Sequence, residues 1–440
     1  MMNIGWEKVR SEVTQLLVDL IRINTTNPPG NEYEAALYLQ EFCNRQGIEA
    51  TIYASASKRG NLVATVRGNG TGRPLILLSH LDVVAANAAQ WTHQPFAGEI
   101  SDGYVWGRGA LDMKGMLAME LMALVLYKQS GLTPNRDLIL VAAADEEAGG
   151  DFGMDWLMKQ QIPGIEAAEY VINEGGEGMI RNGIPVYTCQ NGEKGVLWVK
   201  LTVQGTPGHA SMPTKDNAIT RLANILTRLG RHKQPMVLTE TTRQYLFKLA
   251  KTRGLRLPEE SGSLDFSLQM FAKRHFKGER SVEAMFYNTV TPTIIKAGEK
   301  TNVLPECCEV TLDCRLLPGE TPEQFLEKLQ NYINTPDVKF EIIHAAAPTE
   351  SPVNTELFRI MEETVREEDP RAVLVPYLSP GGTDSRYFRQ KGVTAYGFVP
   401  ILITEEDLQR MHGIDERISI DNLERGTKIL YNVIKKLSNS

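Results

Sequence analysis

The stretch Pro74-Leu75-Ile76-Leu77-Leu78-Ser79-His80-Leu81-Asp82-Val83-Val84 decides the fold. Its apolar run follows the turn signal Gly72-Arg73-Pro74, which is typical of a strand buried on both faces of a sheet. The run ends in His80, and Asp82 follows two residues later. An imidazole and a carboxylate at the carboxyl end of a buried strand lie where open α/β sheets bind their ligands. We therefore expect a site at this edge with Asp82 behind His80, although a solvated strand end would show the same pattern.

Two later apolar runs repeat this pattern. Residues 138–144 lead into Asp145-Glu146-Glu147, and residues 170–172 lead into Asn173-Glu174-Gly175-Gly176. Helical patterns lie between the runs, and one of them, residues 113–127, is nearly all apolar. Strands that alternate with helices predict a largely parallel sheet with helices on both faces. Such a sheet would present all three polar strand ends at one edge.

The pattern of the chain changes after about residue 190. The expected elements then follow the order strand-helix-strand-strand-helix-strand, which is typical of a ferredoxin-like domain. They lie near residues 196–203, 216–230, 289–296, 309–316, 322–333 and 338–343. The predicted fold class is therefore α/β, with a discontinuous catalytic domain and an inserted smaller domain. We expect the catalytic domain to comprise residues 1–190 and 347–440, and the insert to comprise residues 191–346 with an extra, partly helical segment near 235–288.

Length and composition are those of an ordinary globular protein. A chain of 440 residues exceeds the usual size of a single hydrophobic core, so two domains are expected. The net charge of −7 provides no basic surface for nucleic acid or for an anionic membrane. The five cysteines lack a Cys-x-x-Cys spacing, which argues against a disulfide or a thiolate zinc site. With neither a signal peptide nor a long apolar segment, we expect a soluble, cytoplasmic protein.

Carboxylates and imidazoles recur at the predicted strand ends and in nearby loops. Asp112 precedes the apolar helix, where it could cap the helix or bind a cation. Glu146 and Glu147 are consecutive at a strand end, so one could bind a metal while the other addresses water. His412 lies in a polar loop, where a lone histidine is usually a bystander. Carboxylates gathered in one crevice repel each other unless a cation neutralises them. Imidazole and carboxylate ligands without thiolate suit Zn, Mn or Co.

An ordered set of motifs runs through nearly the whole chain. They are Ser79-His80-Leu81-Asp82-Val83-Val84, Gly107-Arg108-Gly109-Ala110-Leu111-Asp112-Met113-Lys114-Gly115, Asp145-Glu146-Glu147, Asn173-Glu174-Gly175-Gly176, Gly205-Thr206-Pro207-Gly208-His209-Ala210-Ser211, Thr301-Asn302-Val303-Leu304-Pro305, Pro380-Gly381-Gly382-Thr383-Asp384-Ser385 and His412-Gly413. In these motifs the chain resembles the metallopeptidase family that contains aminoacylase, carboxypeptidase G, acetylornithine deacetylase and succinyl-diaminopimelate desuccinylase. The resemblance implies a zinc-exopeptidase-like catalytic domain and an inserted domain that serves as a lid and a dimer contact.

The resemblance also implies a site with two divalent metal ions per chain. His80, Asp112 and Glu174 would bind one ion. Asp112, Glu147 and His412 would bind the other, so that Asp112 bridges the two. Zinc is the expected metal, with cobalt and manganese as alternatives.

Three further residues receive catalytic roles from the resemblance. Asp82 would support His80 from behind. Glu146 would act as the general base that takes a proton from the attacking water and later delivers it to the leaving amine. His209 would reach an active site, expected to be the partner subunit's, and stabilise the oxyanion of the tetrahedral intermediate.

The substrate's carboxylate would be bound by a separate group of residues. Asn302, Arg315 and the loop of Gly382 and Thr383 resemble this group. The alternative is that they are a turn residue, a strand-surface residue and loop residues, and for Arg315 this alternative explains the position equally well. At the position of Glu174, the family's aminoacylases and carboxypeptidases resemble this chain in having Glu. The family's peptidases that act on a free amino terminus tend to have Asp there. The segment near 235–288 is absent from the compact family members and leaves the dimer interface open.

We therefore predict a metal-dependent hydrolase that cleaves the amide bond of N-acyl-amino acids or of short peptides with a free C-terminal carboxylate. A di- or tripeptidase that requires a free amino terminus is the alternative among enzymes. A metal-free scaffold would have no need to keep repelling acids together, and a phosphoesterase would need a basic phosphate clamp near the motifs. The expected partners are the small substrate and a second copy of the chain, bound as a homodimer through the insert, with no nucleic acid and no membrane. The acyl group, the amino acid and the native metal stay open.

Overall fold

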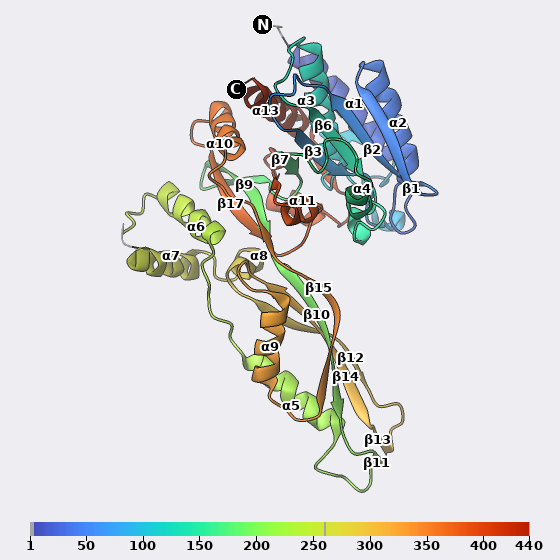
Figure 1. Cartoon of the computed structure of the whole chain (residues 1–440), viewed down its shortest axis with the longest axis vertical. Helices are drawn as coiled ribbons and strands as arrows, with labels where there is room; N and C mark the ends of the chain where they lie inside the picture. The colour runs from blue at the N-terminus through green and yellow to red at the C-terminus, as the bar shows by residue number, and fades with distance from the viewer. Residues whose placement is uncertain (1–3, 259–260, 440) are drawn as a thin grey trace. The chain divides into compact units, whose positions relative to one another are not determined.

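The computed structural model describes residues 4–258 and 261–439, and the chain divides into two compact units (Figure 1). The first unit contains the described residues up to Asn191, the segment Ser351–Tyr377, and the described residues from Thr383 onward. The second unit contains the described residues of Gly192–Glu350 and the short segment Leu378–Gly382. Each unit has a sheet and a hydrophobic core of its own. Among the described residues, no helix is both long and apolar enough to cross a membrane.

A mixed sheet organises the first unit. Part of this sheet follows the strand order β1-β2-β6-β3-β7-β18, in which β6, β3, β7 and β18 are parallel and β1 and β2 are antiparallel at one edge; further strands continue the sheet beyond β18. The strands are β1 Glu49–Ala56, β2 Arg59–Val66, β3 Leu75–His80, β6 Leu138–Ala143, β7 Tyr170–Asn173 and β18 Thr394–Gly397. The predicted α/β class with a largely parallel central sheet is confirmed. The short strand β18 was not predicted.

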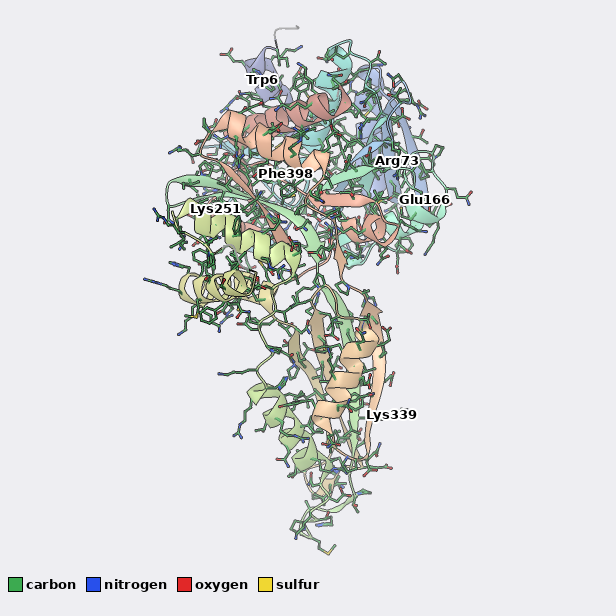
Figure 2. The ribbon with its side chains drawn as sticks, turned by 60° about the vertical axis from the view of Figure 1, so that its left-hand side comes forward. Trp6, Arg73, Glu166, Lys251, Lys339 and Phe398 are labelled. Atoms are coloured by element: carbon green, nitrogen blue, oxygen red, sulfur yellow. The ribbon has the colours of Figure 1, made fainter. Side chains whose placement is uncertain are left out.

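Strand β3 is buried on both faces, as its uninterrupted apolar run predicted. Leu75 and Leu77 pack into the larger core, and Ile76 and Leu78 pack into the smaller core on the opposite face. Five helices contribute to the larger core: α1 Trp6–Arg22, α2 Glu32–Arg45, α3 Lys114–Gln129, α10 Glu356–Glu368 and α13 Ile420–Ser438. The smaller core lies under α4 Met154–Lys159 and α11 Ser385–Gln390. Phe398, just after β18, is fully buried within this unit (Figure 2).

Helix α3 lies in the centre of the larger core. All of its side chains from Lys114 to Tyr127 are buried, which explains why the helix is apolar on all sides except for the buried charged residues Lys114 and Glu120. It packs against α1, α13 and the sheet (Figure 1). The loop that carries Asp112 ends at the first residue of α3. Because α3 is held in the core, the position of that end of the loop is fixed.

The second unit has the predicted ferredoxin-like topology. Its antiparallel sheet follows the order β12-β14-β10-β15, and helices α5 and α9 pack on one face of it. The bounds are β10 Gly195–Gln204, α5 Ala218–Arg231, β12 Thr289–Ala297, β14 Cys307–Leu316, α9 Pro322–Ile333 and β15 Val338–Ala346. Alternate residues of β10 are fully buried under these helices, whereas Trp198 between them is 40% exposed on the other face. This alternation is what a half-covered antiparallel sheet requires.

The extra segment within the second unit is more helical than the sequence indicated. It forms α6 Glu240–Thr252, α7 Ser261–His275, α8 Arg280–Glu283 and the short 3-10 helix η3 Ala284–Phe286. Helices α6 and α7 pack against each other, and Arg243 of α6 forms an ion pair with Asp265 of α7 at 2.8 Å. Lys251, near the end of α6, extends its ammonium over the ring of Phe247, 4.2 Å from the ring centroid (Figure 2).

The remaining elements complete the two units. They are η1 Ala88–Gln90, β4 Glu99–Ser101, β5 Tyr104–Trp106, η2 Glu146–Ala148, β8 Gly178–Arg181, β9 Ile184–Glu193, β11 Gly208–His209, β13 Val303–Leu304, β16 Thr349–Glu350, β17 Val373–Ser379, α12 Glu405–Arg410 and β19 Arg417–Ser419. Strands β8, β9, β16 and β17 extend the main sheet, whereas β4, β5 and β19 form a small separate sheet. It joins the loop before Asp112 to the loop after His412, because β5 pairs with β19.

Candidate active site

Two histidines from distant parts of the first unit face one carboxylate. His80, at the end of β3, places its Nε2 atom 3.1 Å from Oδ1 of Asp112. His412 approaches the same carboxylate from the loop after α12, with its Nε2 atom 2.9 Å from Oδ2. Asp112 thus has one oxygen directed at each imidazole. Asp112 and His412, which the sequence places in two different loops, therefore lie side by side.

Glu147 and Glu174 extend this arrangement on its two sides. The Oε1 atom of Glu147 lies 3.1 Å from Nε2 of His412, and Oε2 of Glu174 lies 3.7 Å from Nε2 of His80. Possible ligand atoms of His80, Asp112 and Glu147 all lie within 4.8 Å of one another, and so do those of His80, Glu146 and Glu174. The adjacent Glu146 and Glu147 carboxylates therefore belong to different parts of the cluster.

The expected support of His80 by Asp82 takes a different form in the structure. The Nδ1 atom of His80 lies 2.9 Å from the backbone carbonyl oxygen of Asp82, and 3.5 Å from its carboxylate. The carboxylate of Asp82 instead accepts hydrogen bonds from the backbone N–H groups of Glu146 and Glu147, at 3.1 and 3.2 Å. Asp82 therefore connects the end of β3 with the acidic turn after β6. Because the carbonyl oxygen can only accept, Nδ1 of His80 carries the proton and Nε2 is directed at the cluster.

The acidic pair does not lie on a strand end, so the predicted reason for its two directions was wrong. Strand β6 ends at Ala143, and Glu146 begins the short 3-10 helix η2. Between them, Asp145 has the left-handed backbone conformation, with φ of 67°. This turn, rather than strand alternation, separates the two side chains. Asp145 is held in place by the Nη2 atom of Arg59 at 2.7 Å and by the backbone N–H of Phe152 at 3.0 Å.

Sequence reasoning missed two polar residues next to this cluster. The side-chain amide of Asn27 donates to Asp82 at 2.8 Å and to Asp145 at 2.9 Å, so it bridges the two buried acids. Asn27 lies in a stretch rich in Asn, Thr and Pro, where nothing local distinguishes it from other loop residues. The carboxylate of Asp384 is buried, and neither of its oxygens has a hydrogen-bond partner among the described residues. Burial raises the pKa of Asp384 to about 7.

The crowding of acids and imidazoles shifts their protonation equilibria. Burial, together with repulsion by Asp112, raises the pKa of Glu174 to about 7. Burial and the charge of Glu174 raise the pKa of Glu146 well above its usual value. Burial disfavours the charged form of His80, but the carboxylates of Glu174 and Asp112 outweigh this effect and raise its pKa. Hydrogen bonds to Asp112 and Glu147 raise the pKa of His412 to about 10.

This set of donors fits divalent cations. The imidazole Nε2 atoms and carboxylate oxygens are ligands that zinc, cobalt and manganese accept, and no thiolate takes part in either group of candidate ligands. Without cations, the carboxylates are held together only by taking up protons or by charging the histidines. Positive ions between them would relieve the same repulsion, and Asp112 could bind one with each oxygen.

The remaining predicted site residues lie elsewhere. His209 and Asn302 are brought together in the second unit, where β11 pairs with β13 and the N–H of Ala210 donates to the carbonyl of Asn302 at 3.0 Å. The Nδ1 atom of exposed His209 contacts the hydroxyl of Ser211 at 2.7 Å. Arg315 of β14 forms an ion pair with Asp313 on its own strand at 2.7 Å.

The division of the chain into two units falls between Gly382 and Thr383. Gly382 is the last residue of the segment Leu378–Gly382 of the second unit, and Thr383 belongs to the first. The Thr383 hydroxyl oxygen lies 3.4 Å from the side-chain nitrogen of Asn173, at the end of β7. Thr383 therefore adjoins the strand that leads directly to Glu174.

Comparisons with known proteins show the family of the chain and agree with its fold. Residues 76–436 match the sequence model of peptidase family M20/M25/M40. The chain is 30% identical to the N-fatty-acyl-amino acid synthase/hydrolase PM20D1 of Xenopus tropicalis, and the match covers 95% of this chain and 84% of that protein. It is 27% identical to Aminoacylase-1 of Mus musculus, over 95% of this chain and 93% of that protein.

A solved structure shows the same fold. The M20 family metallo-carboxypeptidase Sso-CP2 from Sulfolobus solfataricus superimposes with a TM-score of 0.71 at 20% identity, over 98% of this chain and 100% of that one. The family match covers far more than half of the chain, and it includes every residue of the cluster described above. The chain therefore belongs to peptidase family M20/M25/M40 and is a metallo-amidohydrolase or exopeptidase of that family.

Proposed function

We propose that this protein is a two-metal hydrolase that cleaves the amide bond of N-acyl-amino acids or of short peptides with a free C-terminal carboxylate. The observation that carries the proposal is the Asp112 carboxylate, whose two oxygens face the Nε2 atoms of His80 and His412 at 3.1 and 2.9 Å. A carboxylate between two imidazoles, each with a further carboxylate beside it, is the arrangement that a bridged pair of cations requires.

The proposed ligands divide into two sets that share Asp112. His80, Asp112 and Glu174 would hold one ion, and Asp112, Glu147 and His412 would hold the other. We propose zinc as the metal, with cobalt or manganese able to replace it. When bound, the ions would polarise the scissile carbonyl group and lower the pKa of water at the site.

The chain's own residues would handle the proton and the oxyanion. Glu146, whose pKa is raised well above the usual value by burial and by the charge of Glu174, would accept a proton from the attacking water and donate it to the leaving amine nitrogen. Asp82 would fix the position of the acidic turn through its carboxylate and the orientation of the His80 ring through its backbone carbonyl. His209 would donate a hydrogen bond to the oxyanion of the tetrahedral intermediate.

The proposed subsite for the substrate's carboxylate draws on Asn302, Arg315, Gly382 and Thr383. In the second unit, Asn302 lies in the connection before the start of β14 at Cys307, whereas Arg315 is next to the last residue of β14. At 3.4 Å per residue, the eight steps from Cys307 to Arg315 span roughly 27 Å. One small substrate cannot contact both residues of the same chain. We therefore propose that a dimer supplies His209 and Asn302 to a site from the opposite chain.

Mixing two inactive variants should restore activity if His209 acts in trans. A dimer of one His209→Ala chain and one Glu146→Gln chain would have one complete site, because the first chain contributes Glu146 and the second contributes His209. We expect hybrid dimers to recover up to about half of the activity per site, measured after subunit exchange has been verified by native mass spectrometry. Each variant taken alone through the same subunit-exchange procedure serves as the control. Verified exchange without recovery would contradict action in trans.

The relatives favour the N-acyl-amino acid class. PM20D1 is named for N-fatty-acyl-amino acids and Aminoacylase-1 for acylated amino acids, and both match nearly the whole of this chain. The alternative, a di- or tripeptidase that needs a free amino terminus, would require an acidic partner for the substrate's ammonium group. Asp384 is the buried carboxylate that could provide it.

A substrate panel with and without metal tests the proposed function. N-acetyl-, N-succinyl- and long-chain N-acyl-amino acids should be hydrolysed with Zn, Co or Mn, and blocking the substrate's C-terminal carboxylate as an amide should abolish turnover. Exhaustive chelation should remove activity, and added metal should restore it. Full activity in a preparation that elemental analysis shows to be metal-free would refute the proposal. Turnover of dipeptides only when their amino terminus is free would favour the alternative.

A further inference from the structure

A buried glutamate lies behind the candidate metal cluster. Glu416 is fully buried and follows His412 by four residues, just before β19. Its Oε1 atom accepts hydrogen bonds from the backbone N–H groups of Leu111 at 2.7 Å and Asp112 at 3.1 Å. Its Oε2 atom accepts from the N–H of Gly109 at 3.1 Å and from Nη1 of Arg108 at 2.6 Å. One carboxylate thus binds the loop that carries Asp112 at four points.

Arg108 continues this connection to the loop of His412. Its Nη2 atom donates to the backbone carbonyl of Gly413 at 2.8 Å. Its guanidinium group also lies over the ring of Trp91, 5.2 Å from the ring centroid. The backbone N–H of Gly107 donates to the carbonyl of Glu416 at 2.9 Å, which adds a second link between the same two loops. The two charged side chains are 2% and 0% exposed, so water does not screen their interaction.

We infer that Glu416, acting together with Arg108, is a positioning residue that sets the separation between Asp112 and His412. This separation determines the metal position that Asp112 and His412 share with Glu147. This inference rests on the proposed two-metal function. Neither residue touches the proposed ions or the substrate. Glu416 acts through the backbone of Asp112, and Arg108 acts through the carbonyl next to His412.

The two metal positions should depend on this support to different extents. The position of Asp112, Glu147 and His412 takes two ligands from the segments that Glu416 and Arg108 hold. The position of His80, Asp112 and Glu174 takes one ligand from them, because His80 and Glu174 follow β3 and β7. A residue that only stabilised the fold would weaken both positions alike. The ratio of the two affinities therefore separates positioning from general stability.

Glu416→Gln tests the inference with little change in size. The amide would turn an N–H group toward another donor, Gly109 or Arg108, and would leave the buried guanidinium without its counter-charge. Zn or Co binding is measured by competition with a chromophoric chelator, and His412→Ala and His80→Ala identify which step belongs to which position. We expect Glu416→Gln to weaken the ion that His412→Ala removes by about 10- to 100-fold, with a clearly smaller effect on the ion that depends on His80.

Two further variants complete the experiment. Arg108→Lys keeps the charge but cannot reach Glu416 and Gly413 together, so it should weaken the same ion to a smaller extent. Leu39→Ala, in a fully buried position of α2 that packs against β1 and β2, should lower the thermal midpoint and leave the ratio of the two affinities unchanged. Equal weakening of both ions by Glu416→Gln, or no weakening, would overturn the inference. A wild-type protein that binds no pair of ions would instead overturn the proposed function.

Discussion

Glu146→Gln should lower kcat by about 10²- to 10⁴-fold while both metal ions and the affinity for substrate are retained. The amide has the size of the carboxylate but cannot accept the proton of an attacking water. Ligand atoms of Glu146, His80 and Glu174 lie within 4.8 Å of one another, so the carboxylate reaches the place where the reaction would occur. Its raised pKa, caused by burial and by Glu174, suits a group that must accept a proton and then donate it.

Glu147→Gln is the matched control, because the same change is made one residue away. The Glu147 carboxylate lies 3.1 Å from His412, on the other side of the cluster. We expect this variant to lose one ion at low metal concentration and to recover part of its turnover when metal is added. Metal content by elemental analysis and kcat at saturating substrate distinguish the two variants. If Glu146→Gln loses metal while Glu147→Gln keeps it without turnover, their roles are exchanged. Near-normal turnover of both would contradict the mechanism.

Much of the fold could be predicted because its strands carry a local signal. The four-residue apolar core of β3 and the similar run of β6 are long enough to indicate strands buried on both faces, and each run ends at a polar residue. The parallel pairing of β3 with β6 and β7 then brings those ends together. Strand β18 has only four residues and no distinctive flanking signal, so its pairing with β7 could not be predicted.

The support of the site depends on contacts between residues that are distant in the sequence. Glu416 and Asp112 are separated by 304 positions, and Asn27 and Asp145 by 118. A single sequence contains no periodicity that links such pairs. The left-handed turn at Asp145 was missed for a different reason, because aspartate adopts that conformation only where its surroundings stabilise it. Here the stabilising partners are Arg59 and Asn27, which approach from other elements.

Metal binding should release protons at pH 7.5 and should tighten as the pH rises. His412, whose pKa is raised to about 10 by Asp112 and Glu147, carries a proton in the metal-free protein at this pH. His80 also has a raised pKa, because Glu174 and Asp112 outweigh the effect of its burial. Both imidazoles must lose a proton before they can act as ligands. Each released proton makes binding about tenfold tighter per pH unit, so the ion that His412 helps to bind should gain at least about tenfold per unit.

The sign of the effect follows from the direction of the shifts. A histidine whose pKa is raised in the folded protein stabilises the fold below its usual pKa of 6.5, and this contribution is lost as the pH rises toward 10. The thermal stability of the metal-free protein should therefore fall as the pH rises from 6.5 toward 10. Over the same pH range, the stabilisation that bound metal adds should increase. Calorimetric titration with Zn in buffers of different ionisation enthalpy counts the released protons. His412→Ala should release about one proton fewer than the wild type, whereas His344→Ala, on β15 of the second unit, should release the same number. Heat that does not depend on the buffer would mean that no net proton is released, and it would contradict the proposal that the imidazoles carry protons in the metal-free protein.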